Sequence, residues 1–238
     1  MRFSQITSMN TLTNLLLSEG YSRTTKPLSE PLVVHAVAGA GKSTLIRKLL
    51  AQSDAYRAHT NGPPDPPTLA CTSILPFTSN PPQHTFNILD EYPIGQSKGY
   101  KALFADILQH RNNHQSPHFI KTTSHRLGPS TAKLIRETLN IPLEGTGDAE
   151  LKSILPVLGS PLFGILIALT PEVATLLKAH GAKFYCPDQV LGLEFPVVTV
   201  LSTLPLASLP DKSSVYIALS RHTQELHVRS PDTPHPAP

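Results

Sequence analysis

The sequence predicts an α/β protein with a mostly parallel sheet, and three observations carry this prediction. Short apolar and β-branched runs, such as residues 32–34 and 197–201, alternate with segments whose apolar residues recur at helical spacing. The 24 prolines among 238 residues are about twice the ~5% average share, which favours short elements joined by many loops. Charged residues make up 16% of the chain, too few for a supercoiled rod or a polyelectrolyte tail. A packed core is therefore expected.

The length and charge bound the class of protein. A chain of 238 residues fits one ordinary domain or two small ones. The net charge of +3 permits a nucleic-acid partner but does not argue for one. Two cysteines, Cys71 and Cys186, make neither a disulfide framework nor a zinc site by themselves. The most apolar stretch, 162–169, is far shorter than the ~20 residues of a membrane span, so we expect a soluble protein with no secretory leader and no direct membrane insertion.

Candidate elements follow one another along the first half of the chain. Leu12, Leu15 and Leu16 lie at helical spacing, and Gly20 is placed to end that helix. The other expected elements are a polar linker at 21–31, a buried strand at 32–34, a helix at 44–51, a proline-rich loop at 61–67 and a strand at 86–89.

The second half, from about residue 119, continues the alternation. Ser130 is expected to cap one helix, and Thr170 followed by Pro171 starts another, which Gly181 ends. Residues 215–219 stay ambiguous, because their periodicity also fits a strand. The remaining expectations are apolar helix positions Leu134, Ile135, Leu139, Val173, Leu176 and Leu177, strands at 163–168 and 197–201, and a frayed proline-rich tail at 231–238.

A glycine-rich segment at 36–43 lies between the expected strand and helix, the context that a phosphate-binding loop requires. Its backbone N–H groups can cradle phosphates, and Gly39 and Gly41 leave room for them. Lys42 can reach the β- and γ-phosphates, and the Ser43 hydroxyl can coordinate Mg²⁺. Ala36 replaces the usual first glycine, and a chance glycine-rich turn is the alternative. The residues expected to bind the nucleotide are Ala36, Gly39, Ala40, Gly41, Lys42, Ser43 and Thr44.

An acidic pair, Asp90-Glu91, follows the expected strand at 86–89. A carboxylate at the carboxyl end of a strand can hold Mg²⁺ beside the serine of a phosphate-binding loop, so Ser43 and Asp90 are the candidate metal ligands. Glu91 can orient the attacking water. A solvated acidic turn is the alternative.

Two further groups carry weaker signals. His110, His114 and His118 have the spacing of one helical face, but Asn112-Asn113 and Pro117 disfavour a continuous helix, so metal binding is not expected. The densest basic stretch could contact RNA phosphates or could be a solvated helix face, and this choice stays open. Its members are Lys121, His125, Arg126, Lys133 and Arg136.

The ordered set of motifs resembles the superfamily 1 viral helicases. The short chain looks similar to the first triple gene block proteins of potexvirus-type plant viruses, and the match covers about residues 21–228. The motifs are Ala36 to Ser43, Asp90-Glu91-Tyr92, Phe104-Ala105-Asp106 with Gln109, Thr123-Ser124-His125-Arg126, Gly192-Leu193-Glu194-Phe195 and Ala218-Leu219-Ser220-Arg221, with Tyr21-Ser22-Arg23-Thr24 and residues 100–106 in support.

The resemblance implies a P-loop nucleoside triphosphatase with two abbreviated RecA-like lobes. It places an N-terminal helix and linker at 1–28, lobe 1 at 29–118, lobe 2 at 119–229 and a disordered tail at 230–238. It also favours a helix at 215–219, followed by a strand at 226–228.

Catalytic roles follow from the same resemblance. Gln109 resembles the glutamine that senses the γ-phosphate, and Arg126 and Arg221 resemble arginines that reach the nucleotide from the second lobe. With Lys42 and Glu91 they form the expected catalytic set. A surface salt bridge is the alternative for either arginine. Gly192 and Glu194 resemble the motif that couples RNA to nucleotide. Two departures, Ala105 for a common glycine and Leu191 for a common glutamine, are expected to weaken the coupling of hydrolysis to unwinding.

The resemblance further implies ATP or another nucleoside triphosphate with Mg²⁺, binding of single-stranded viral RNA, movement between plant cells through plasmodesmata, and suppression of RNA silencing. The expected partners are a second copy of the chain, the viral coat protein, other triple gene block proteins and host silencing factors. The expected location is the host cytoplasm, at plasmodesmata or in inclusions. The alternatives are a nucleotide- and RNA-binding assembly protein with little hydrolysis, and a small-molecule kinase, which leaves the motifs from Gln109 to Arg221 unused.

Overall fold

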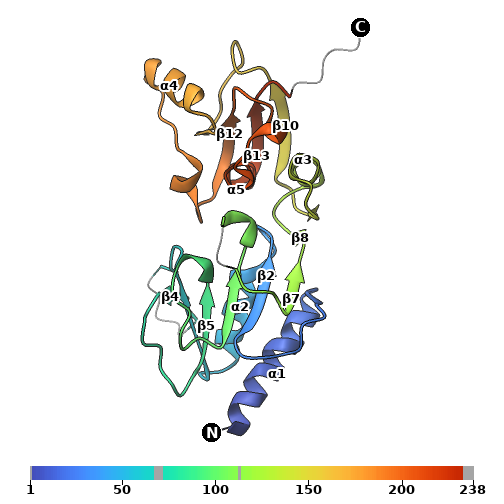
Figure 1. The fold of residues 1–238 in the computed structure, drawn as a ribbon, viewed down its shortest axis with the longest axis vertical. Helices are drawn as coiled ribbons and strands as arrows, with labels where there is room; N and C mark the ends of the chain where they lie inside the picture. Colours follow the sequence, from blue (N-terminus) through green and yellow to red (C-terminus); the bar gives the residue numbers. More distant parts are fainter. Residues whose placement is uncertain (1, 67–71, 112–113, 233–238) are drawn as a thin grey trace. The chain divides into compact units, whose positions relative to one another are not determined.

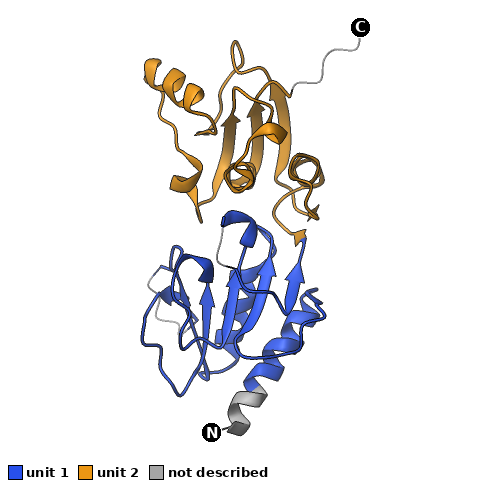
Figure 2. Cartoon of the chain, in the orientation of Figure 1, with its two compact units in different colours: residues 1–122 blue, residues 123–238 orange. Residues whose placement is uncertain are grey.

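The computed structural model describes residues 2–66, 72–111 and 114–232, with side chains from residue 8 onward. The chain forms two compact units, residues 1–122 and 123–238 (Figure 2). Strands and helices alternate, and the sheets are mostly parallel (Figure 1), so the predicted α/β class is confirmed.

The first unit is built on a sheet that has seven strands among the described residues, in the order β1-β7-β2-β6-β5-β3-β4. The interior strand β2 pairs in parallel with β6 and β7, while β1 pairs with β7 in the antiparallel sense. Since β6 also pairs in parallel with β5, the carboxyl ends of β2, β6 and β5 lie at one edge of the sheet, where ligands of open α/β sheets bind. The strands are β1 (Ser22–Arg23), β2 (Leu32–Ala36), β3 (Tyr56–Thr60), β4 (Leu75–Pro76), β5 (Phe86–Asp90), β6 (Ala102–Ala105) and β7 (Phe119–Lys121).

Two α-helices, α1 (Arg2–Ser18) and α2 (Lys42–Gln52), and two short 3₁₀ turns, η1 (Tyr92–Ile94) and η2 (Ile107–Gln109), complete the first unit. The predicted N-terminal helix is confirmed: Leu12 and Leu16 are fully buried, and Gly20 follows the helix in the left-handed conformation with φ of 79°. Glu19, just beyond α1, pairs with Lys48 of α2 at 2.6 Å. This ion pair joins the end of the N-terminal helix to the helix that follows the glycine-rich segment.

The second unit contains, in the part of the chain described, a four-stranded parallel sheet in the order β10-β13-β12-β11. A short pair, β8 with β9, lies outside this sheet. The elements are β8 (Thr123–Ser124), α3 (Pro129–Leu139), β9 (Glu144–Gly145), β10 (Glu150–Leu155), β11 (Ile165–Ala168), α4 (Pro171–Ala179), η3 (Pro187–Val190), β12 (Phe195–Leu201), η4 (Leu206–Ser208), α5 (Lys212–Leu219) and β13 (His222–Arg229).

The ambiguous run at 215–219 is helical, as the family resemblance implied, and forms the end of α5. All five of its side chains are buried. A helix that is covered on every side has no polar face, and this explains why its periodicity resembled that of a buried strand.

Several boundaries differ from the expectations. The capping role expected for Ser130 is wrong: Gly128 precedes α3, Pro129 is its first residue, and the Ser130 hydroxyl bonds the carboxylate of Glu150 instead. Proline suits a first helical position because it has no N–H to leave unsatisfied. The expected division after residue 118 falls before β7, which pairs with β2 and belongs to the first unit.

The expected tail at 230–238 begins too early. The buried Ser230 donates its backbone N–H to Leu155, and the Asp232 carboxylate accepts from the backbone N–H of Leu206. The rest of that segment, 233–238, lies outside the described residues, as do Cys71 and the end of the expected loop at 61–67.

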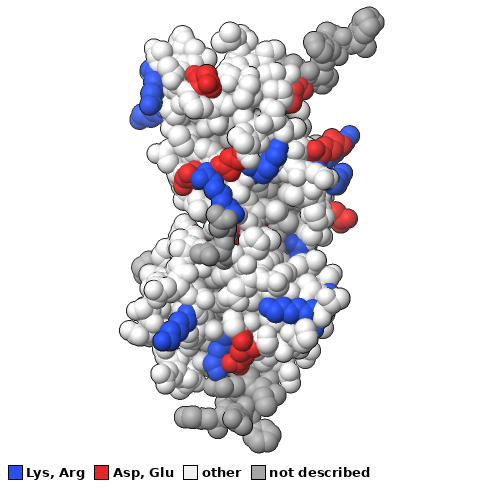
Figure 3. Space-filling view, in the orientation of Figure 1, with Lys and Arg blue, Asp and Glu red and all other residues white. Residues whose placement is uncertain are grey.

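Two surface properties bear on function. In the described part of the chain, no helix is long and apolar enough to cross a membrane. On the face seen in Figure 3, Lys and Arg are scattered and interspersed with Asp and Glu rather than gathered in one basic stripe.

Candidate active site

The glycine-rich segment forms a tight turn between the interior strand β2 and α2. Gly39 and Gly41 have φ of 73° and 89°, the left-handed region that favours glycine. A Cβ on Gly41 would meet no atom within 4 Å, so backbone conformation rather than crowding requires glycine there. The turn is held by the N–H of Ala40, which donates to Val37 at 3.2 Å.

The start of α2 is suited to an anion. Among the described residues no side chain caps this helix, whose N-cap is Gly41, and its first turn has no acidic residue. The first N–H groups of a helix lack internal partners, and the helix dipole is positive at that end. Lys42 donates to the Ala36 carbonyl oxygen at 3.2 Å, so its ammonium lies at the same turn. Ser43 is half-buried in the first helical turn, and Thr44 is exposed.

Asp90 is the last residue of β5 and is buried. Burial raises the pKa of this carboxyl, the neighbouring charge of Glu91 raises it further, and Lys42 and Arg47 oppose the shift. A bound cation stabilises the charged form of a carboxyl that is buried beside another carboxylate. Together with the Ser43 hydroxyl, Asp90 offers the hard oxygen ligands that Mg²⁺ prefers, so the residues present fit that ion.

Glu91 lies directly after β5 with φ of 53°, a strained conformation for a residue other than glycine. Its carbonyl oxygen accepts from the Asn61 amide at 3.2 Å, and its own N–H donates to the Asp90 carboxylate at 3.1 Å. Its carboxylate lies 2.9 Å from Nε2 of His110. The spacing of His110 indicated only possible metal ligation, and no local pattern in the sequence signals its contact with Glu91.

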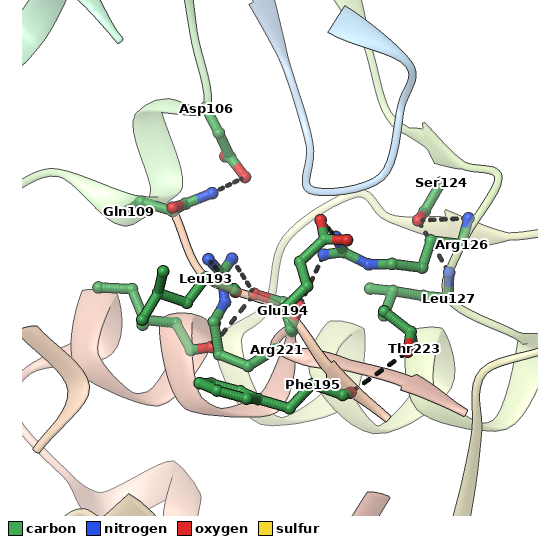
Figure 4. Close-up of polar contacts among 12 residues, drawn as sticks. Asp106, Gln109, Ser124, Arg126, Leu127, Leu193, Glu194, Phe195, Arg221 and Thr223 are labelled. Atoms are coloured by element: carbon green, nitrogen blue, oxygen red, sulfur yellow. Dashed lines mark hydrogen bonds and ion pairs between the residues drawn. The ribbon is translucent and has the colours of Figure 1, made fainter. Parts of the chain in front are cut away.

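Gln109 ends η2, and its amide donates to the Asp106 carboxylate at 2.7 Å (Figure 4). Asp106 also caps η2 by accepting from the N–H of Leu108. The predicted set therefore belongs entirely to the first unit, at or after the carboxyl ends of β2, β5 and β6; its members are Lys42, Asp90, Glu91 and Gln109.

The second unit gathers three sequence motifs around Arg126 and Arg221. Arg126 pairs with the Glu194 carboxylate and donates to the Ser220 carbonyl at 2.7 Å (Figure 4). Arg221, only 3% exposed, donates to the carbonyl oxygens of Ile217 at 3.1 Å and Leu193 at 3.4 Å. Segments 123–126, 192–195 and 218–221 thus form one cluster within this unit.

The basic stretch does not form one surface. Lys121 is buried in the first unit, where its ammonium donates to the Glu19 carbonyl at 2.8 Å and lies 5.2 Å from the centre of the Tyr21 ring. Lys133 and Arg136 lie exposed on α3 in the second unit. Lys121 is therefore not part of a surface basic patch.

The three spaced histidines have separate surroundings. His118 accepts the Val33 N–H at 2.8 Å, His110 contacts Glu91, and His114 lies edge-on to His35. The described part of the chain holds no group of three residues that could ligate a metal through His, Cys, Asp or Glu.

Comparisons with known proteins show the family of this chain. Residues 32–230 match the family model of the viral superfamily 1 RNA helicase core domain. The chain is 48% identical over 231 residues to the movement and silencing protein TGBp1 of Papaya mosaic potexvirus, covering 95% of this chain and 97% of that protein. It is 40% identical over 227 residues to the movement and silencing protein TGBp1 of Potato virus X (strain CP), covering 93% and 99%.

Solved structures show the same fold at low identity. The complex of the Arterivirus nonstructural protein 10 helicase with DNA aligns with a TM-score of 0.54 and 16% identity, covering 84% of this chain. The chain spans 60% of the length of that helicase. The likeness supports the predicted RecA-like superfamily 1 fold.

Proposed function

We propose that this chain, which belongs to the TGBp1 movement and silencing protein family and has a viral superfamily 1 helicase core, is a Mg²⁺-dependent nucleoside triphosphatase that acts on RNA. The observation that carries the proposal is the meeting of the glycine-rich turn and the Asp90-Glu91 pair at the carboxyl edge of one sheet. That juxtaposition is what phosphoryl transfer to water needs.

The chain's own residues divide the work of hydrolysis. The N–H groups of the turn and the ammonium of Lys42 bind the phosphates of ATP or another nucleoside triphosphate and neutralise their charge. Ser43 and Asp90 would hold Mg²⁺, which would neutralise phosphate charge. Glu91 orients the attacking water, and Gln109 senses the γ-phosphate.

Arg126 and Arg221 act on the nucleotide from the second unit in this proposal. A planar guanidinium can match the equatorial oxygens of the transferred phosphoryl group in two bonds. The family membership and the clustering of three sequence motifs around these two side chains support this role.

RNA binding and transport complete the proposal. The chain binds single-stranded viral RNA, carries it through plasmodesmata, and suppresses host RNA silencing, as a soluble protein of the host cytoplasm that associates with itself, coat protein, other triple gene block proteins and silencing factors. The family membership supports these roles. Since Ala105 and Leu191 depart from replicative helicases, unwinding is weak and limited to short duplexes. The alternative, an assembly protein with little hydrolysis, gains support from the same departures.

ATP hydrolysis by the Lys42→Ala variant tests the proposal. The matched control is Lys48→Ala, on the same helix. Lys48 is exposed and pairs with Glu19, away from the turn. Lys42→Ala is expected to lose nearly all turnover while keeping its circular dichroism spectrum, and Lys48→Ala to keep wild-type turnover. Wild-type hydrolysis by folded Lys42→Ala would contradict the assignment of the glycine-rich turn.

A further inference from the structure

The carboxylate of Glu91 is held by a contact that the proposed function does not use. His110 Nε2 lies 2.9 Å from Oε2 of Glu91, and the two side chains are 9% and 19% exposed, respectively. A carboxylate can only accept a hydrogen bond, so Nε2 of His110 carries the proton and donates it. Such a charge-assisted bond is stronger than one between neutral groups and depends less on solvent where the pair is largely covered.

The backbone hydrogen bonds of Glu91 do not fix the position of its side chain. The residue lies in the left-handed region directly after β5, with its N–H and carbonyl oxygen engaged by Asp90 and Asn61. These bonds fix the backbone but not the side-chain torsions. A general base must lie within hydrogen-bond reach of the water that it orients. The side-chain torsions of Glu91 therefore determine how often its carboxylate reaches that water.

His110 is also tied to the element that carries Gln109. It follows η2 directly, and its N–H donates to the Ile107 carbonyl at 3.1 Å. Gln109, the preceding residue, bonds Asp106 through its own side chain. One short turn therefore bears the proposed γ-phosphate sensor and the partner of the proposed water-orienting carboxylate.

We infer that His110 is a positioning residue: its Nε2–H holds the Glu91 carboxylate in place for the attacking water and links Glu91 to the Gln109 turn. The inference rests on the proposed function. It assigns His110 a role in turnover and none in binding the nucleotide.

Two substitutions separate positioning from packing. A glutamine side chain places its Nε2 donor about where histidine places its own, so His110→Gln preserves the bond to Glu91. His110→Leu fills similar space without a donor. His84, which is exposed in the same unit, provides the control His84→Leu.

The experiment measures kcat for ATP hydrolysis and the Kd of ADP with Mg²⁺ in these three variants. Loss of a partner that orients a catalytic group typically lowers activity roughly 10- to 100-fold. We expect that loss in kcat for His110→Leu, a Kd within about twofold of wild type, and recovery to within about fivefold in His110→Gln. Unchanged kcat in His110→Leu, or equal losses in His110→Leu and His110→Gln, would overturn the inference.

A double-mutant cycle with Glu91→Gln tests whether His110 acts through Glu91. We expect Glu91→Gln with His110→Leu to be no slower than Glu91→Gln alone, whereas additive losses would refute action through Glu91. Failure of the proposed function looks different: wild type and His84→Leu would then both lack Mg²⁺-dependent hydrolysis, and the role of His110 would fall with it.

Discussion

His35 makes the stability of the first unit depend on pH in a way that can be worked out from its surroundings. It lies in β2, directly before the glycine-rich turn, and is 4% exposed. Its Nε2 is 2.9 Å from the Tyr92 hydroxyl, and among the described residues its Nδ1 meets no hydrogen-bond partner. Protonation would add a buried N–H without an acceptor, so burial lowers the pKa to about 4, with further lowering by His114, Lys26 and Lys42.

The sign of the effect follows from linkage. The unfolded chain binds a proton at His35 with its ordinary pKa of 6.5, and the folded chain with a pKa of about 4. Both states are neutral well above pH 6.5. As the pH falls from 7 to 5 only the unfolded state takes up the proton, so the free energy of unfolding drops by roughly 1–2 kcal/mol. Below about pH 4 the loss levels off, because both states are then protonated.

Urea denaturation of wild type and His35→Gln at pH 7 and pH 5, followed by circular dichroism, tests this prediction. His59, His118 and His222 also have lowered pKa values, but they are present in both proteins and cancel in the comparison. We expect wild type to lose roughly 1–2 kcal/mol more than His35→Gln on acidification. The control His84→Gln should behave as wild type. An equal loss in wild type and His35→Gln would refute the reasoning.

Five further outcomes are expected. Arg221→Ala should lower kcat by about 10³-fold with a smaller change in nucleotide Kd, and Arg221→Lys should rescue poorly because an ammonium lacks the planar fork; equal losses in kcat and affinity would make it a binding residue only. The same change should destabilise the second unit by about 1–3 kcal/mol, measured by urea unfolding, because carbonyls of Ile217 and Leu193 lose a donor. Gly41→Ala should cost about 1–2 kcal/mol through its φ alone, and an unchanged melting temperature would contradict this. Chelation of Mg²⁺ should abolish hydrolysis reversibly, and EDTA-resistant turnover would contradict this. Purified protein should unwind short duplexes only, and efficient opening of long duplexes would contradict that expectation.

Local patterns were sufficient where the structure itself is local. The strand, turn and helix at 32–52 are contiguous, and the residue types of each segment indicate its structure. Buried β-branched residues form the strand, glycines with positive φ form the turn, and helix-forming residues follow. The acidic pair at the end of β5 was identified for the same reason. The helical run at 215–219 needed the family resemblance, because the burial of all five residues removes the periodicity on which a pattern depends.

Long-range pairing could not be predicted from patterns. Strand β1 lies in the segment expected to be a polar linker, since two residues that pair with β7 carry no periodic signal. The contact of Glu91 with His110 spans 19 positions, and that of Arg126 with Glu194 spans 68. Such contacts depend on the order of strands in the sheet and on loop paths, which neighbouring residues do not encode. For Ser130, Pro129 at the first helical position prevailed over the capping preference of serine.

The steady-state rate of ATP hydrolysis with Mg²⁺, measured with and without single-stranded RNA in wild type and Lys42→Ala, shows whether the glycine-rich turn is the site of RNA-stimulated hydrolysis. We expect hydrolysis by wild type that RNA increases several-fold, and none above background by Lys42→Ala under either condition. Wild-type hydrolysis that is absent, or equal in both proteins with or without RNA, would contradict the claim that this chain is an RNA-dependent nucleoside triphosphatase.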